Sequence, residues 1–368
     1  MATLQPALPK QHYVDPATFA VERDRVLAHE WYCAGRAAEL GLDRPGRLAV
    51  IDVLGESVLV ARTRDGELAG HYNVCRHRGS QLFPAGPDDP MPSVQDAKAI
   101  RCPYHSWTYD LDGTLLRAPH TEDVDDFDAT SFGLRPVGVE VWAGFLFVHL
   151  TPATARPLTD AIGPAAERLI RYPLGDLVVG QALSYDVAAN WKLIAENYNE
   201  CYHCAGVHPE LCRLVPAFAR GGQSLEWESG IPHREGAWTF TASGTSDRAP
   251  FAGLDDAERV RHKGELIYPN LMLSLSADHV AAFLLTPVAA DRCRIECQLL
   301  FAPDEVAKPS FDPTDAGDFW DVVNRQDWNI CASVQRGMSS RSYEQGWFAP
   351  MEDESLDIRR WLLPRLEA

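Results

Sequence analysis

The sequence of 368 residues contains no hydrophobic run long enough to cross a membrane. Its most apolar stretch, residues 141–150, falls far short of the roughly 20 residues that a membrane helix needs. The N-terminal stretch M-A-T-L-Q-P-A-L-P-K has no basic region followed by an apolar core, so no secretory signal is visible. Nine cysteines, an odd number in a long chain, do not resemble the disulfide framework of a secreted protein. We therefore expect a cytoplasmic protein that does not bind membranes, with cysteines free to serve as core residues or metal ligands.

Basic residues are scarce relative to acidic ones. The 34 Lys and Arg residues stand against 52 Asp and Glu residues, which gives a net charge of −18. A chain this acidic repels phosphate backbones, so nucleic acid is not an expected partner. A cationic substrate or a basic protein partner is favoured, but net charge alone identifies neither. The share of hydrophobic residues, 46%, is that of an ordinary globular protein and excludes a disordered chain.

A β-rich region begins at about residue 47. The runs L-A-V-I-D-V, S-V-L-V-A-R and E-L-A-G-H-Y are β-branched or alternating, and Gly-Glu and Asp-Gly turn signals separate them. This pattern predicts a small antiparallel sheet that continues through residues 107–111 and 144–150. Residues 85–97 are rich in Pro, Asp and Gly, and we predict that they form a loop inserted in this region.

Helical patterns flank the β-rich region. Residues 16–30 have apolar positions at helical spacing and follow Asp15 as a cap. Beyond T-P-A-T-A-R-P near residue 150, helical stretches alternate with strand-like runs such as L-M-L-S-L-S and C-R-I-E-C-Q-L-L-F. These helical stretches are residues 155–171, 190–204 and 315–341. The sequence therefore predicts a β domain followed by an α+β domain.

Two Cys–His pairs lie within the β-rich region. Cys75 and His77 form C-x-H, and Cys102 and His105 form C-x-x-H. Two cysteines and two histidines can bind one zinc ion tetrahedrally. They can also hold a Rieske [2Fe–2S] centre, in which two thiolates bind one iron and two imidazoles the other. Structural zinc favours C-x-x-C pairs, whereas each pair here offers one sulfur and one nitrogen, which suits two irons bridged by sulfide.

A second group of metal-ligating residues follows N-W-K-L-I-A-E-N-Y-N. Glu200 and His203 are three residues apart, so on a helix they share a face. His203 and His208 are five apart, which on an ideal helix separates them by about 140°. One metal could hold both only if the helix distorts or ends between them, and Gly206 and Pro209 supply reasons for this. On the residues alone, two such histidines are more often structural than metal-binding.

The Cys–His pairs resemble a known family. Their surroundings, N-V-C-R-H-R-G-S and R-C-P-Y-H-S-W-T-Y-D-L-D-G, resemble the two cluster-binding loops of Rieske non-haem iron oxygenases. The resemblance implies that Cys75 and Cys102 bind one iron of a [2Fe–2S] cluster and that His77 and His105 bind the other. The interval between the loops is longer than is usual in the family, and its composition indicates a surface excursion.

The second group resembles the catalytic iron site of the same family. In E-N-Y-N-E-C-Y-H-C-A-G-V-H the resemblance makes His203 and His208 ligands of a mononuclear Fe(II). The downstream segment N-R-Q-D-W-N-I-C-A-S-V-Q-R-G matches the family's third ligand at Asp327, and Asp318 and Asp321 lie outside that motif. The implied site is a 2-His-1-carboxylate triad with open positions for O2.

The resemblance also implies a domain plan. Residues 1–45 would be an N-terminal helical segment that packs on the catalytic domain, residues 46–150 a Rieske domain, and residues 151–368 the catalytic domain, an antiparallel sheet covered by helices. Electrons would come from NAD(P)H through a separate flavin and iron–sulfur reductase, because no G-x-G-x-x-G fingerprint occurs here.

Glu200 would link the two metal centres. In this family the cluster of one subunit serves the iron of its neighbour in a homotrimer. By carry-over, His105 would hydrogen-bond Glu200, and Glu200 would contact a ligand of the next subunit's iron. A carboxylate suits this role because it accepts hydrogen bonds from imidazole N–H groups on both sides.

Glutamate at position 200 resembles the family branch that acts on quaternary ammonium compounds such as glycine betaine. The expected reaction hydroxylates an N-methyl carbon of a small organic cation, and the product collapses to a demethylated amine and formaldehyde. Such a cation needs an aromatic cage, for which the candidates are Tyr268, Phe283, Trp347 and Phe348. The alternatives are an aromatic-ring hydroxylating dioxygenase with the same metal sites, a Rieske electron carrier and a zinc-stabilised binding module.

Overall fold

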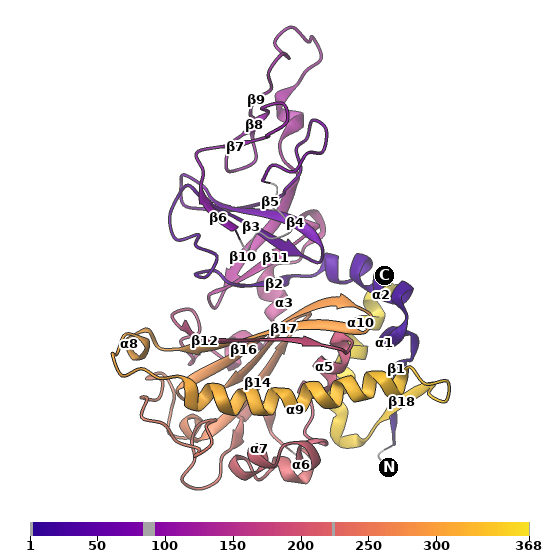
Figure 1. Ribbon diagram of the computed structural model, residues 1–368, viewed down its shortest axis with the longest axis vertical. Coiled ribbons are helices and arrows are strands. Elements are labelled where there is room, and N and C mark those ends of the chain that lie inside the picture. Colours follow the sequence, from indigo (N-terminus) through magenta and orange to yellow (C-terminus); the bar gives the residue numbers. More distant parts are fainter. Residues whose placement is uncertain (1–2, 84–92, 223–224, 368) are drawn as a thin grey trace. The chain divides into compact units, whose positions relative to one another are not determined.

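The computed structural model describes residues 3–83, 93–222 and 225–367 (Figure 1). The chain divides into two compact units, which we call the β domain, Leu27–Ala161, and the α+β unit, made of residues up to Val26 and from Ile162 onward. The strands pair antiparallel in every ladder of the described residues, as at β3–β4 and β16–β17. The predicted α+β fold class is confirmed.

The β domain is built on a sheet in the order β2-β11-β10-β5-β4-β3-β6. Its strands are β2 (Tyr32–Arg36), β3 (Arg47–Val53), β4 (Glu56–Arg62), β5 (Leu68–Tyr72), β6 (Ser93–Asp96), β10 (Pro136–Trp142) and β11 (Phe145–His149). Strands β3 and β4 pair from Leu48↔Ala61 to Val53↔Glu56, so Leu54 and Gly55 form a two-residue loop with φ of 58° and 89°. Positive φ at both loop positions is typical of a type I′ turn, whose backbone twist matches that of the flanking strands. The two predicted strands are therefore joined as a tight hairpin.

A smaller sheet, β7-β8-β9, completes the β domain. Its strands are β7 (Ile100–Arg101), β8 (Thr108–Tyr109) and β9 (Leu115–Arg117), and the domain's helical turns are η1 (Leu27–His29), η2 (Ala129–Phe132) and η3 (Pro152–Thr154). Of the predicted loop 85–97, residues 85–92 lie outside the described residues. Residues 93–96 of this range were predicted as loop but form strand β6, which pairs with β3 through Leu48↔Gln95 and Ala49↔Val94. Composition alone does not reveal this backbone pairing.

The β domain begins and ends at other residues than predicted. Strand β2 pairs with β11, as at Tyr32↔Val148, so residues 27–45 belong to this domain and not to an N-terminal segment of 45 residues. The domain ends at Ala161, within α3 (Leu158–Ile162), and not at residue 150. The predicted helix 16–30 ends at Arg25, and the strand that follows is too short to give a periodic signal.

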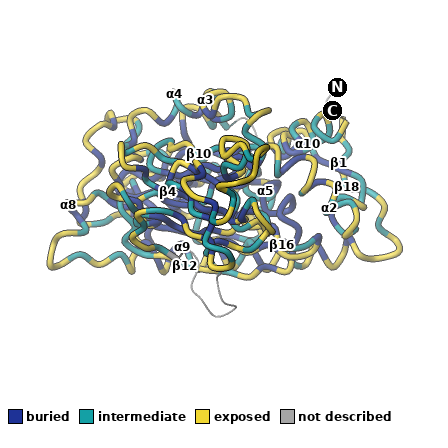
Figure 2. Tube along the Cα trace, turned by 90° about the horizontal axis from the view of Figure 1, so that it is seen from above, coloured by how far each residue is buried: buried dark blue, intermediate teal, exposed yellow. Residues whose placement is uncertain are grey.

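The α+β unit contains a sheet in the order β12-β17-β16-β15-β14-β13. Its strands are β12 (Val178–Val187), β13 (Ile231–Pro232), β14 (Arg261–Ile267), β15 (Leu271–Leu275), β16 (His279–Ala289) and β17 (Arg292–Phe301). Strand β16 is buried along most of its length. Figure 2 colours the chain by burial, with exposed loops in yellow and buried segments in dark blue. The long helix α9 (Thr314–Met338) runs along this sheet (Figure 1). The Tyr185 hydroxyl of β12 donates to Asp321 of α9 over 2.8 Å, which helps to hold the helix on the sheet.

Shorter helices complete the α+β unit. They are α1 (Gln11–Val14), α2 (Pro16–Arg25), α4 (Ala165–Arg168), α5 (Trp191–Tyr198), α6 (Cys204–Val207), α7 (Pro209–Leu214), α8 (Pro303–Val306) and α10 (Asp357–Glu367), with the turns η4 (Phe218–Arg220), η5 (Trp227–Ser229), η6 (Glu258–Val260) and η7 (Pro350–Leu356). In the described residues no helix is both long and apolar enough to cross a membrane.

The start of the chain is tied to the α+β unit. Strand β1 (Gln5–Pro9) pairs with β18 (Gln345–Phe348) near the other end of the chain. The Lys192 ammonium of α5 lies 2.6 Å from the Glu22 carboxylate of α2, and both side chains are fully buried. The Tyr13 hydroxyl also donates to Glu196 over 2.5 Å. These buried polar contacts join α1 and α2 to α5, the helix that leads into the candidate iron site.

Candidate metal centres

The histidines of the second group lie at the ends of short helices. Helix α5 starts at Asn190, whose side chain accepts from the Lys192 N–H, and it ends at Tyr198. Glu200 lies in the turn that follows, His203 directly precedes α6, and His208 lies between α6 and α7. The prediction that Glu200 and His203 share a helix face is therefore wrong. Helix α5 ends at Tyr198, before both histidines. His203 and His208 are therefore not held about 140° apart on one ideal helix, and one metal can reach both.

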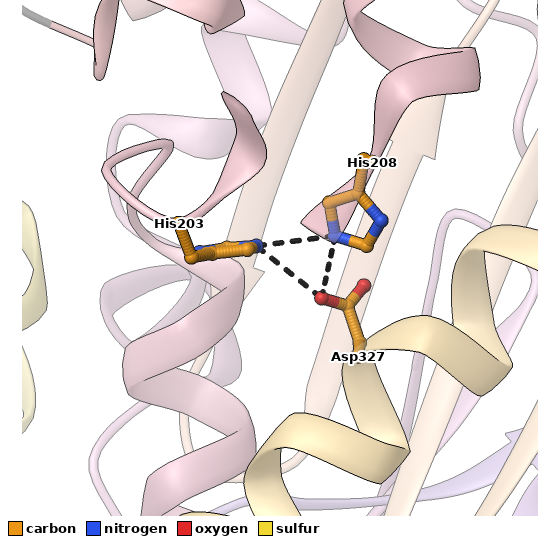
Figure 3. Close-up of side chains that lie close together, drawn as sticks. All are labelled: His203, His208 and Asp327. Carbon is orange, nitrogen blue, oxygen red and sulfur yellow. Dashed lines mark hydrogen bonds and ion pairs between the residues drawn. The ribbon is translucent and has the colours of Figure 1, made fainter. Parts of the chain in front are cut away.

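Three side chains meet at this point (Figure 3). His203 Nε2 and His208 Nε2 lie 3.2 Å apart, and they lie 3.3 Å and 2.8 Å from Asp327 Oδ1. Asp327 comes from α9, far along the chain. Three ligands at right angles with metal–ligand bonds of about 2.1 Å lie about 3.0 Å from one another. The observed distances therefore fit one face of an octahedral divalent metal.

The electrostatics of the three side chains also suit a cation. Burial raises the pKa of Asp327, but the contacts with His203 and His208 outweigh it and hold the pKa below its usual range. The carboxylate therefore remains ionised at neutral pH. The competing carboxylate Asp321 is engaged elsewhere, with the hydroxyl of Tyr185 and the guanidinium of Arg325.

Hydrogen bonds fix which ring nitrogen faces the metal position. His203 Nδ1 lies 2.5 Å from Glu200 Oε1, and His208 Nδ1 lies 2.8 Å from Gln326 Oε1. Gln326 Nε2 donates to Glu210 Oε2 over 3.0 Å, so its oxygen must be the atom that faces His208. Both Nδ1 atoms therefore carry a proton and face away from the metal position, so a metal bound there would take the Nε2 position of each ring. The sequence analysis missed Gln326 and Glu210, although each is a close sequence neighbour of a predicted ligand.

Glu200 contacts the histidine of its own chain. Besides the ring of His203, its carboxylate accepts from the backbone N–H groups of Tyr202 and His203. The contact with a candidate iron ligand therefore lies within one chain, whereas the sequence analysis placed it at the next subunit. The expected hydrogen bond from His105 to Glu200 stays a prediction.

A cavity opens beside the three side chains. It is also lined by aromatic rings, each in contact with the next, with neighbouring centroids 4.6–6.2 Å apart. This aromatic belt consists of Trp227, Phe218, His262, Phe240 and Trp320. Burial lowers the pKa of His262 to about 3, so this ring is neutral. The carboxylate residue Glu354 lines the same cavity.

The predicted cage residues lie elsewhere. Tyr268 stacks on Trp361 with centroids 4.9 Å apart, and Phe283 is buried in strand β16. Trp347 and Phe348 belong to β18 and line a different cavity. The prediction of these four residues as the cage is therefore wrong for the cavity beside the three candidate ligands. Aromatic residues are common in the chain, and the sequence does not show which of them the fold brings together.

The four residues of the first group lie in two turns of the β domain. The Gly79 N–H donates to the Cys75 carbonyl over 3.1 Å, and the Ser106 N–H donates to the Cys102 carbonyl over 3.1 Å. Both thiols are buried, with 2% of each residue exposed. The rings of His77 and His105 lie 4.7 Å apart between centroids, and His77 is exposed. Two sulfurs on the core side and two imidazoles toward the surface fit the donor set of a Rieske cluster.

Hydrogen-bond donors surround the two sulfurs. The Tyr109 hydroxyl lies 3.3 Å from Cys75 Sγ. Burial raises the pKa of Cys102, but the backbone N–H groups of Tyr104 and His105 outweigh it and lower the pKa. Such donors stabilise thiolates, and in iron–sulfur proteins they raise the reduction potential of the cluster.

Models of two known protein domains match separate parts of the chain. The model described as "Rieske [2Fe-2S] domain" matches residues 30–128, and the model described as "Ring hydroxylating alpha subunit (catalytic domain)" matches residues 174–368. The chain is 29% identical to the glycine betaine monooxygenase oxygenase subunit of Chromohalobacter salexigens, over 98% of this chain and 87% of the relative. It is also 29% identical to the carnitine monooxygenase oxygenase subunit of Acinetobacter baumannii, over 91% and 86%. The crystal structure of the quaternary ammonium Rieske monooxygenase CntA with L-carnitine is similar, with a TM-score of 0.73, 25% identity and coverage of 99% of this chain and 96% of that chain.

Proposed function

The chain belongs to the family of ring-hydroxylating oxygenase alpha subunits, and we propose that it hydroxylates an N-methyl group of a small quaternary ammonium compound. Members of this family are oxygen-dependent Rieske oxygenases that carry a [2Fe–2S] cluster and a mononuclear iron. The substrate class is our proposal, and relatives that act on glycine betaine and carnitine support it. We further propose that a separate reductase supplies the electrons and that the chain works as a homotrimer.

The geometry supports a definite set of ligands. In our proposal, Cys75 and Cys102 hold one iron of the cluster and His77 and His105 hold the other. The mononuclear iron is held by His203, His208 and Asp327, whose ligand atoms already lie at octahedral spacing. When bound, the cluster passes electrons one at a time and the mononuclear iron activates dioxygen.

The aromatic belt is the observation that carries the substrate class. A quaternary ammonium group has no N–H and cannot donate a conventional hydrogen bond, so ring faces and carboxylates are the groups that recognise it. The cavity offers five rings and the side chain of Glu354, whose pKa is raised by burial to about 7. Among the described residues that line it there is no lysine or arginine.

The protein's own residues hold the reacting centre in place. Glu200 and Gln326 keep protons on the outer nitrogens of His203 and His208, so the Nε2 atom of each ring faces the metal position. The belt excludes water from the methyl group. One oxygen atom of O2 enters a methyl C–H bond and the other becomes water, with two electrons and two protons from the reductase system. The hydroxylated carbon then leaves nitrogen as formaldehyde, and the amine takes the proton.

Product analysis tests the proposal. The holoenzyme is supplied with a surrogate reductase and NAD(P)H, and oxygen uptake is followed with glycine betaine, carnitine, choline and an arene. We expect oxygen uptake with at least one quaternary amine and one formaldehyde per O2 consumed. A cis-diol from the arene without formaldehyde from any amine would contradict the proposal and favour an aromatic-ring dioxygenase.

A further inference from the structure

Trp320 lines the cavity from the same helix that carries Asp327. The two residues are seven positions apart on α9, which is almost two full turns, so they lie on the same face. Trp320 is only 5% exposed, and its indole N–H donates to His279 Nε2 over 2.9 Å. His279 does not line the cavity, so this bond anchors the ring from behind the aromatic belt.

The anchoring bond fixes the tautomer of His279. An indole N–H can only donate, so His279 Nε2 accepts and the ring proton lies on Nδ1. His279 Nδ1 lies 2.8 Å from Asp278 Oδ1, and Asp278 is 1% exposed. The other carboxylate oxygen, Oδ2, accepts from Arg248 Nε over 2.9 Å and from the Ser246 hydroxyl over 2.8 Å. Asp278 Oδ1 also accepts from the Thr239 hydroxyl, a group that can turn to accept instead of donate. The chain Asp278–His279–Trp320 is therefore a buried hydrogen-bond relay in which the proton of His279 lies on Nδ1.

Trp320 is the belt ring best suited to bind a cation. Trp227 is stacked on Phe218 at an interplanar angle of 23°, and Phe240 is stacked on Phe319 at 10°, so each has a face covered. The ring contacts of Trp320 within the described residues are all edge-to-face, with interplanar angles of 72–89°, so none of these rings stacks flat on it. Tryptophan is also the side chain with the strongest cation–π attraction.

We propose that Trp320 is the ring that binds the ammonium group of the substrate, and that Asp278 is a positioning residue that acts on it through the tautomer of His279. This inference rests on the proposed function and adds the residue that recognises the charge. The rigid helix α9 then sets the separation between the bound cation and Asp327, and the relay sets the tilt of the ring.

The first experiment asks whether Trp320 recognises charge. The dissociation constants of choline and of its neutral carbon analogue, 3,3-dimethylbutan-1-ol, are measured by calorimetry on the anaerobic holoenzyme. We expect Trp320→Leu to weaken choline binding by about 30-fold, because a desolvated cation–π contact is lost. Binding of the neutral analogue should change less than about three-fold. Equal weakening of both probes would show that Trp320 only fills space and would overturn the proposal.

The second experiment isolates the relay with Asp278→Asn. Arg248 can only donate, whereas the Ser246 and Thr239 hydroxyls can also accept, so the new amide turns its oxygen toward Arg248 and its NH2 group toward His279 and Thr239. The ring proton of His279 then moves to Nε2, where it opposes the indole N–H, and Trp320 is displaced. We expect choline binding to weaken by about ten-fold, since the indole N–H loses its acceptor and the ring leaves its place in the cavity wall.

Trp320→Phe provides the matched background, because its ring has no N–H to oppose. In that background we expect Asp278→Asn to change choline binding less than about two-fold. Equal effects of Asp278→Asn in both backgrounds would overturn the relay. If Asp278→Asn fails to fold, as judged by thermal unfolding and cluster absorbance, the comparison of the two probes with Trp320→Leu still decides the role of Trp320. If the wild type binds no quaternary ammonium at all, the proposed function fails; undiminished binding by Trp320→Leu refutes this inference alone.

Discussion

Gln326 should raise the affinity of the α+β unit for its mononuclear iron. The change Gln326→Leu keeps the approximate size of the side chain but removes the oxygen that lies 2.8 Å from His208 Nδ1. His208 is 1% exposed, so water cannot replace the lost bond. Loss of such a partner behind a metal-binding histidine typically lowers metal affinity by about 10–100-fold. This corresponds to about 1.4–2.7 kcal/mol of binding free energy.

The assay is an anaerobic titration of iron-depleted enzyme with Fe(II) against a competing chelator. Acid-labile sulfide is measured in parallel, and we expect it to equal that of the wild type, since the cluster loops are not touched. Gln298→Leu is the matched control, because Gln298 is buried in β17 and its amide donates to Glu296, away from the candidate ligands. Unchanged iron affinity in Gln326→Leu, or equal loss in the control, would refute the reasoning.

The remaining predictions concern the two metal sites and the buried charges. His208→Ala should lose turnover and mononuclear iron but keep the rhombic resonance of the reduced cluster, and Cys102→Ser should lose that resonance; loss of both centres in either variant would contradict separate sites. Glu22→Gln leaves the fully buried ammonium of Lys192 without its carboxylate, so urea denaturation should show a loss of about 3–5 kcal/mol in unfolding free energy; a loss below 1 kcal/mol would argue against the pair. Burial raises the pKa of Glu196 from 4.5 to about 8, so the proton that it gains on folding stabilises the protein fully below pH 4.5, and this stabilisation is lost as the pH rises to about 8. Glu196→Gln should therefore flatten the decline of Tm over this range, and an unchanged slope would show that Glu196 is ionised throughout.

The sequence predicted the elements that have a regular pattern. The strands β3, β4, β15 and β17 and the helix α9 were found because their apolar residues repeat with the period of the element. Strands β1 and β2 were not predicted, because their pairing with β18 and β11 depends on residues far away in the sequence. The helix expected over residues 190–204 broke at Tyr198, and no periodic signal marks that end.

The candidate site was predictable only in part, and for a related reason. Motif spacing identified His203, His208 and Asp327, which the structure brings within hydrogen-bond distance. It did not identify Gln326, because the role of this residue depends on the tautomer of His208. It also missed Trp320, whose role depends on a wall assembled from separate strands and loops. Residues that bind the metal directly follow a motif that can be recognised in the sequence. Residues that support them become recognisable only once the fold has brought them together.

The division of the α+β unit into two separated chain segments has a consequence for biosynthesis. Strand β1 leaves the ribosome before the whole β domain, and its partner β18 leaves it more than 300 residues after β1. The β domain is complete once Ala161 has emerged, so it can fold while the residues that follow are still being translated. The iron-binding half must instead wait until β18 has emerged. A nascent chain that stalls before residue 345 would therefore hold a finished electron-transfer module beside an unfinished oxygenase, with its first strand unpaired.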